Sequence, residues 1–191
     1  MSSRRPLILL DIDGVCSPMC PPDQLDTRWA PWRRATCGWN KGWVSPTLGH
    51  ALSALTPHAD VWWCSGWEDE APRYGTELGV PSWPYIPILN SPDAGMFKLK
   101  SVIAQVGQRP VWWFDDEHNP ASEQWAARRT AAGIPTVSAP IDNKRGLRPE
   151  DLTSATNWAR AIDHNIALPP PDLAFRPGTV DRYRSTQPRR E

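Results

Sequence analysis

Residues 7–15 read Leu-Ile-Leu-Leu-Asp-Ile-Asp-Gly-Val, and this stretch decides the fold. Four consecutive apolar residues are typical of a strand that is buried on both faces, as in a parallel sheet. We expect a strand over 6–11 and a bend at Gly14, which would leave Asp11 and Asp13 at the rim of the sheet. Two carboxylates this close repel unless one protonates or a cation neutralises both, and Mg²⁺ prefers oxygen ligands. A plain Asp-rich turn is the alternative for this peptide alone.

The chain has 191 residues, a length that suits one compact domain with its own core. Its 21 basic residues balance 21 acidic ones, so no overall field would hold a membrane or a long nucleic acid, and only a local basic patch could do so. The sequence has neither a run of about 18 apolar residues nor the pattern of a secretory signal. These features predict a cytoplasmic protein without a membrane partner.

The cysteines, Cys16, Cys20, Cys37 and Cys64, lack the paired short spacings of a zinc ribbon. Free thiols are therefore expected, and Cys64 lies in an apolar run where a buried thiol is the ordinary outcome. A zinc site built from Cys16, Cys20, Cys37 and His50 is the alternative.

Twelve tryptophans and 22 prolines exceed ordinary usage. The pairs Trp62-Trp63 and Trp112-Trp113 are expected to pack in the core. Residues 17–45 are expected to form an irregular loop. In this loop basic residues alternate with aromatic ones: Arg28, Arg33, Arg34 and Lys41 lie among Trp29, Trp32, Trp39 and Trp43. Such a loop could bind phosphates and stack on bases at a nucleic-acid end, or it could be a solvated loop pinned by its own tryptophans.

Strand and helix patterns alternate along the rest of the chain. Strands are expected over 6–11, 59–64, 85–89, 110–114 and 134–138, and helices over 47–57 (capped by Ser45, with Pro46 first), 69–78, 98–107, 120–132 and 149–162. This order predicts an α/β domain over 1–166, a Rossmann-like doubly wound parallel sheet with helices on both faces. Residues 167–191, rich in Pro and Arg, are expected to be an extended or disordered tail.

Three of the expected strands end in polar clusters: Asp11 with Asp13, Ser65 with Gly66, and Asp115 with Asp116. In an open parallel sheet the ligand site lies beyond the carboxyl ends of the strands, so these clusters should meet. Carboxylates that can attack phosphorus or transfer a proton, a hydroxyl with a backbone N–H for phosphate oxygens, and a nearby lysine together suit phosphoryl transfer.

Four segments, in order, resemble the motifs of the haloacid dehalogenase superfamily of phosphohydrolases: 10–15 (LDIDGV), 63–68 (WCSGWE), Lys98 at a helix start, and 113–117 (WFDDE). The Trp-rich second and fourth segments look like the small actinobacterial and phage branch that also occurs in RNA repair proteins. The resemblance covers residues 6–162.

The resemblance implies that Asp11 is the nucleophile and a Mg²⁺ ligand. Asp13 would be the general acid and base, and its backbone carbonyl would be a second ligand. Ser65 and the Gly66 N–H would bind phosphoryl oxygens, while Lys98 would steady the charge of nucleophile and phosphate.

Asp115 is expected to bind the metal directly, with Asp116 acting through water or as a hydrogen-bond acceptor. Lys98 and Lys100 are two residues apart and would point to different faces of a helix, so only one can serve. Lys98 is preferred, because its distance to Arg109-Pro110 fits the pattern of the superfamily better. Glu68 and Glu117 are left outside the site.

No cap domain of ordinary size fits between the motifs, so the 17–45 loop would be a minimal cap, with Arg33 and Arg34 as candidate substrate-binding residues. The resemblance implies a Mg²⁺-dependent phosphatase working through an aspartyl phosphate, on a nucleotide or a nucleic-acid terminal phosphate. A phosphate- or nucleic-acid-binding module with little turnover, a phosphatase of small metabolites, and a phosphotransferase are the alternatives. The sequence predicts no oligomeric state.

Overall fold

A four-stranded parallel sheet forms the centre of the protein, in a computed structural model that describes residues 5–89 and 98–164. Strand β1 (Leu7–Leu10) pairs with β4 (Asp60–Trp63) on one side and β5 (Val111–Asp115) on the other, and β6 (Thr136–Pro140) pairs with β5. All four residues of β1 are fully buried, as expected for a central strand in a parallel sheet. The predicted α/β fold is confirmed.

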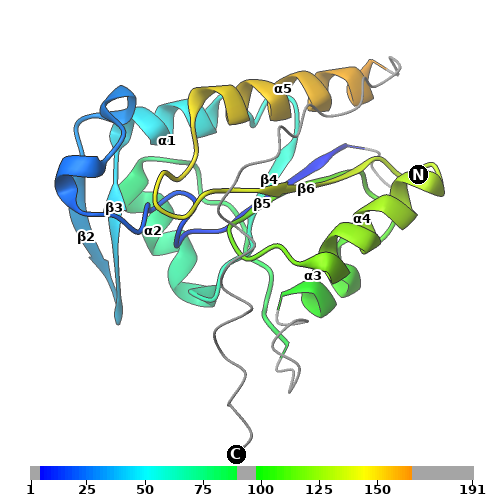
Figure 1. The fold of residues 1–191 in the computed structure, drawn as a ribbon, viewed down its shortest axis with the longest axis horizontal. Coiled ribbons are helices and arrows are strands. Elements are labelled where there is room, and N and C mark those ends of the chain that lie inside the picture. Colours follow the sequence, from blue (N-terminus) through cyan, green and yellow to red (C-terminus); the bar gives the residue numbers. More distant parts are fainter. Residues whose placement is uncertain (1–4, 90–97, 165–191) are drawn as a thin grey trace, which may run out of the picture.

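Helices cover both faces of this sheet (Figure 1). Ile8 and Leu10 face a core shared with α1 (Pro46–Ser53), α2 (Ala71–Leu78) and α5 (Pro149–Asp163). Leu7 and Leu9 face the opposite core, which contains residues of α3 (Leu99–Val106) and α4 (Pro120–Ala131). Alternate side chains of β1 thus contribute to two separate cores. The fold therefore has three layers, with the sheet between two layers of helices.

The predicted helix start at Ser45 is confirmed. The Ser45 Oγ accepts a hydrogen bond from the Leu48 N–H at 3.1 Å, and Pro46 occupies the first turn, where its missing N–H costs nothing. The predicted core role of the paired tryptophans is also confirmed for Trp63, Trp112 and Trp113, which are at most 4 % exposed.

The prediction of an irregular loop over 17–45 is wrong. This region contains 3-10 turns at Pro22–Gln24 and Thr27–Trp29, followed by an antiparallel hairpin of β2 (Arg33–Cys37) and β3 (Asn40–Val44). Gly38, with φ +59°, and Trp39 form the two-residue turn, and a glycine at positive φ is what such turns require. Figure 1 shows the hairpin beside the sheet rather than within it.

The predicted strand over 85–89 is reduced to one parallel bridge between Tyr85 and Trp63. The Trp63 N–H donates to Pro84 O and the Ile86 N–H donates to Trp63 O, both at 2.8 Å. Toward the N-terminus, Pro84 has no N–H to donate to β4. Toward the C-terminus, the Ile88 N–H donates to Glu68 Oε1 at 2.9 Å instead of to β4, so the ladder extends in neither direction. The predicted tail lies outside the described residues. Among the described helices, none has the length and apolar character needed to cross a membrane.

Candidate functional site

Asp11 and Asp115 lie side by side where two neighbouring strands end. Asp11 directly follows β1 and Asp115 is the last residue of β5, and the Asp11 N–H donates to Phe114 O at 3.1 Å. The carboxylate of Asp11 accepts the Ile12 N–H at 2.7 Å, and that of Asp115 accepts the Glu117 N–H at 2.9 Å. Both side chains are buried, so the sheet edge holds two fixed acids.

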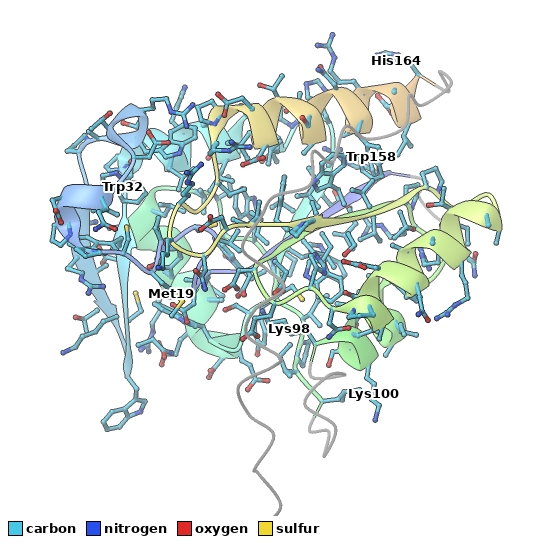
Figure 2. The ribbon with its side chains drawn as sticks, viewed as in Figure 1. Met19, Trp32, Lys98, Lys100, Trp158 and His164 are labelled. Carbon is cyan, nitrogen blue, oxygen red and sulfur yellow. The ribbon has the colours of Figure 1, made fainter. Side chains whose placement is uncertain are left out.

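The ammonium of Lys98 lies between these two carboxylates. It donates to Asp11 Oδ2 and, at 2.9 Å, to Asp115 Oδ2, and the lysine side chain is only 7 % exposed. Although burial alone would lower it, the carboxylates of Asp115 and Asp11 raise the pKa of Lys98 well above its usual value. Lys100, by contrast, is exposed, and in Figure 2 it lies at the outer edge of the molecule, away from Lys98.

Asp116 completes an acidic cluster at the same edge. Ligand atoms of Asp11, Asp115 and Asp116 lie within 4.8 Å of one another. Gly14 makes room for the third acid: with φ +70°, it would place a Cβ atom 2.5 Å from Asp116 Oδ2. A hydrogen bond from Asn143 also holds the Asp116 carboxylate.

The electrostatics of the cluster favour a divalent cation. Burial raises the pKa of Asp11 to about 7, with Lys98 opposing this rise and Asp115 adding to it. Burial, followed by the charge of Asp115, raises the pKa of Asp116 to about 6. The ammonium of Lys98 pairs with two of these three carboxylates, and an oxygen-only donor set of this kind fits Mg²⁺. The acids at the sheet edge could therefore hold a metal ion.

Asp13 stands at the rim and is exposed, unlike Asp11. Its Oδ2 accepts a 2.7 Å hydrogen bond from the indole Nε1 of Trp67. No feature of the sequence pairs these two residues, which are 54 positions apart, and only the fold brings them together.

Ser65 follows β4 in the loop that faces Asp11. Its hydroxyl is buried and hydrogen-bonds the Asp11 carboxylate, and Gly66 beside it is exposed. The loop therefore brings the Ser65 hydroxyl to the acidic edge.

The two candidate arginines lie on the hairpin and not among the acids. Arg33 pairs with Glu77 of α2 at 2.7 Å, and Arg34 stacks over the Trp43 ring at 4.3 Å. Trp29 is buried and donates to Leu147 O at 2.7 Å, whereas Trp39 is 98 % exposed in the hairpin turn. Core packing thus accounts for Trp29 and does not account for Trp39.

The zinc alternative finds no support in the described residues. Within 5–89 and 98–164, the acidic cluster is the one group of three or more Cys, His, Asp or Glu side chains placed to hold an ion. The four cysteines are free thiols, as predicted.

Comparisons with protein-family models, with curated proteins and with solved structures found no match.

Proposed function

We propose that this protein is a Mg²⁺-dependent phosphatase of the haloacid dehalogenase superfamily, which acts through an aspartyl phosphate on Asp11. The observation that carries the proposal is the buried Asp11–Lys98–Asp115 arrangement with Asp116 beside it at the ends of β1 and β5. A buried carboxylate held by a backbone N–H and an ammonium is a fixed nucleophile.

In the first half of the reaction, a carboxylate oxygen of Asp11 attacks phosphorus and the bond from phosphorus to the ester oxygen breaks. Asp13 gives its proton to that departing oxygen. Ser65 and the Gly66 N–H bind the phosphoryl oxygens, and Lys98 offsets their negative charge.

In the second half, Asp13, now a carboxylate, takes a proton from water. The water oxygen attacks phosphorus, the bond to Asp11 breaks, and Asp11 and Asp13 return to their starting states. Mg²⁺, held by Asp11, Asp115, Asp116 and the Asp13 carbonyl, would neutralise charge between the anionic substrate and the anionic nucleophile.

A basic and aromatic rim supports a nucleotide or a nucleic-acid terminal phosphate as the substrate. Asn143, which holds Asp116, is followed by the exposed Lys144 and Arg145. The carbonyl of Asn143 accepts the Met19 N–H at 2.7 Å, and the adjacent Cys20 carbonyl accepts the Trp43 indole N–H at 3.4 Å. This chain of contacts links the acidic edge to the hairpin that bears Arg34 and Trp39. On the hairpin, Arg34 lies over the ring of Trp43, and a cation beside an aromatic ring suits phosphates and bases.

Hydrolysis of 4-nitrophenyl phosphate with Mg²⁺ tests the reaction. We expect Asp11→Asn to reduce turnover at least about 10³-fold, because the amide cannot act as the nucleophile. Asp60→Asn is the matched control, since Asp60 begins β4 at the opposite end of the sheet and pairs with Arg5 and Arg109. Metal-dependent binding of phosphate without any turnover by the unchanged protein would favour the binding-module alternative.

The substrate class is tested with oligonucleotides that carry a 3′ or a 5′ phosphate. We expect the double change Lys144→Ala, Arg145→Ala to raise KM for the oligonucleotide several-fold while KM for 4-nitrophenyl phosphate stays the same. Arg128→Ala, an exposed position on α4, is the control. A nucleic-acid substrate also predicts that KM rises with salt, because phosphate contacts release counterions. Equal KM values for the rim variant and the unchanged protein would exclude this substrate site.

A further inference from the structure

We propose that Trp67 is a positioning residue for Asp13: its indole N–H fixes one carboxyl oxygen so that the other carries the transferred proton. This inference rests on the proposed phosphatase reaction and adds a residue to it. The observation behind it is the 2.7 Å hydrogen bond from Trp67 Nε1 to Asp13 Oδ2.

The donor in this bond is held rigidly. Trp67 is 4 % exposed, and its ring meets Tyr74 edge to face, with centroids 5.2 Å apart. The hairpin covers the ring from another side, where Gly42 lies so close that a Cβ atom would be 3.3 Å from the far edge of the indole. The Tyr74 hydroxyl in turn donates to Trp43 O at 2.8 Å. A rigid donor thus holds an acid that is itself exposed and would otherwise sample several rotamers.

The indole N–H determines which oxygen of Asp13 is free for chemistry. An indole nitrogen only donates, and the carbonyl oxygen of a carboxylic acid accepts more strongly than its hydroxyl oxygen, so the bond to Oδ2 favours the acidic proton on Oδ1. As the bond from phosphorus to the ester oxygen breaks, its electron pair stays on that oxygen, which takes the proton from Oδ1. When water later attacks the phosphoryl group, Oδ1 takes one proton back. Trp67 keeps its own proton throughout.

A second tryptophan provides a matched comparison. Trp63 is fully buried and also meets Tyr74 edge to face, at 5.9 Å, yet its Nε1 has no hydrogen-bond partner among the described residues. The two indoles therefore share burial and an aromatic neighbour, and differ in whether the N–H reaches Asp13.

The test compares esters whose leaving groups depend differently on protonation. An alkyl phosphate needs a proton on its leaving oxygen, whereas 4-nitrophenolate departs readily without one. We expect Trp67→Phe to lower kcat/KM for the alkyl ester about tenfold or more beyond its effect on the aryl ester, a fraction of the ~10²–10⁴-fold that a general acid contributes. Trp63→Phe should change both esters by the same factor. Mg²⁺ affinity, measured by titration calorimetry, should stay the same in both variants.

Replacing each tryptophan with benzothienylalanine, which keeps the bicyclic shape and lacks the N–H, repeats the comparison if either Phe variant unfolds. An unchanged ratio of alkyl to aryl kcat/KM after loss of the Trp67 N–H would overturn the inference while leaving the phosphatase proposal standing. An unchanged protein that hydrolyses neither ester would instead overturn the proposed function, and this inference with it.

Discussion

At the scale of single residues, the site depends on one cation between two buried acids. The ammonium of Lys98 pairs with the carboxylates of both Asp11 and Asp115. Removing the ammonium would leave two carboxylates facing each other at the sheet edge. Breaking a buried ion pair in this way is costly, because the remaining charges lose their compensation.

Lys98→Met is therefore expected to lower kcat for 4-nitrophenyl phosphate about 10²-fold or more, since charge stabilisation of the transition state is lost. Lys100→Met should behave as the unchanged protein, because Lys100 is exposed on another face of α3. Steady-state kinetics of both variants, with circular dichroism to confirm folding, measure the effect. Loss of activity in Lys100→Met alone would reverse the assignment.

Gly14 is the second residue on which the acidic cluster depends. In Gly14→Ala the new methyl group would collide with the Asp116 carboxylate, so we expect Mg²⁺ affinity to fall about tenfold or more. Gly133→Ala is the control, because Gly133 has a similar φ of +82° but open space around the Cβ position. Both variants share the backbone strain, and only the first moves an acid. Equal affinities in titration calorimetry would show that Asp116 does not contribute to binding.

At the scale of elements, α1 and α2 approach each other through a glycine. A Cβ atom at Gly49 would lie 1.9 Å from the backbone carbonyl oxygen of Leu78, at the end of α2. That oxygen cannot rotate away as a side chain would, so the two helices would have to separate.

Gly49→Ala is expected to destabilise the fold by about 2 kcal/mol. The overpacking cost of up to about 3 kcal/mol exceeds the gain of about 1 kcal/mol in helix propensity. His50→Ala, at an exposed position of the same helix, gains propensity without the clash and should be neutral or slightly stabilising. Urea unfolding measures both. A more stable Gly49→Ala protein would mean that α2 moves freely.

At the scale of the whole molecule, the bound metal should stabilise the fold. The three acids repel in the absence of an ion, so Mg²⁺ at a hundredfold excess over Kd should add about 2.7 kcal/mol and raise Tm by several degrees. Asp115→Asn should lose most of this shift. Thermal unfolding with Mg²⁺, and with NaCl at matched ionic strength, separates the ion from general screening.

The acidic edge could be predicted from sequence because it follows from two local signals and one rule of folding. Apolar runs before Asp11 and Asp115 mark buried strands, and parallel strands bring their carboxyl ends to one edge. The hairpin cannot be predicted in the same way, because its inward residues, such as Ala35 and Gly42, are small and give no apolar alternation. The contact between Trp67 and Asp13 depends on how the hairpin and α2 pack, which no local pattern encodes.

One proline beside β4, Pro87, also affects how copies of the protein meet. An unprotected outer strand presents a row of amide hydrogens that a second chain can adopt as a template for intermolecular pairing. Pro87 interrupts that row on the outermost segment of the sheet, because its missing N–H would face away from β4, whereas the amide of its neighbour Ile86 faces inward and donates to Trp63. This edge of the sheet is thereby less able to pair with a strand of another molecule and to aggregate.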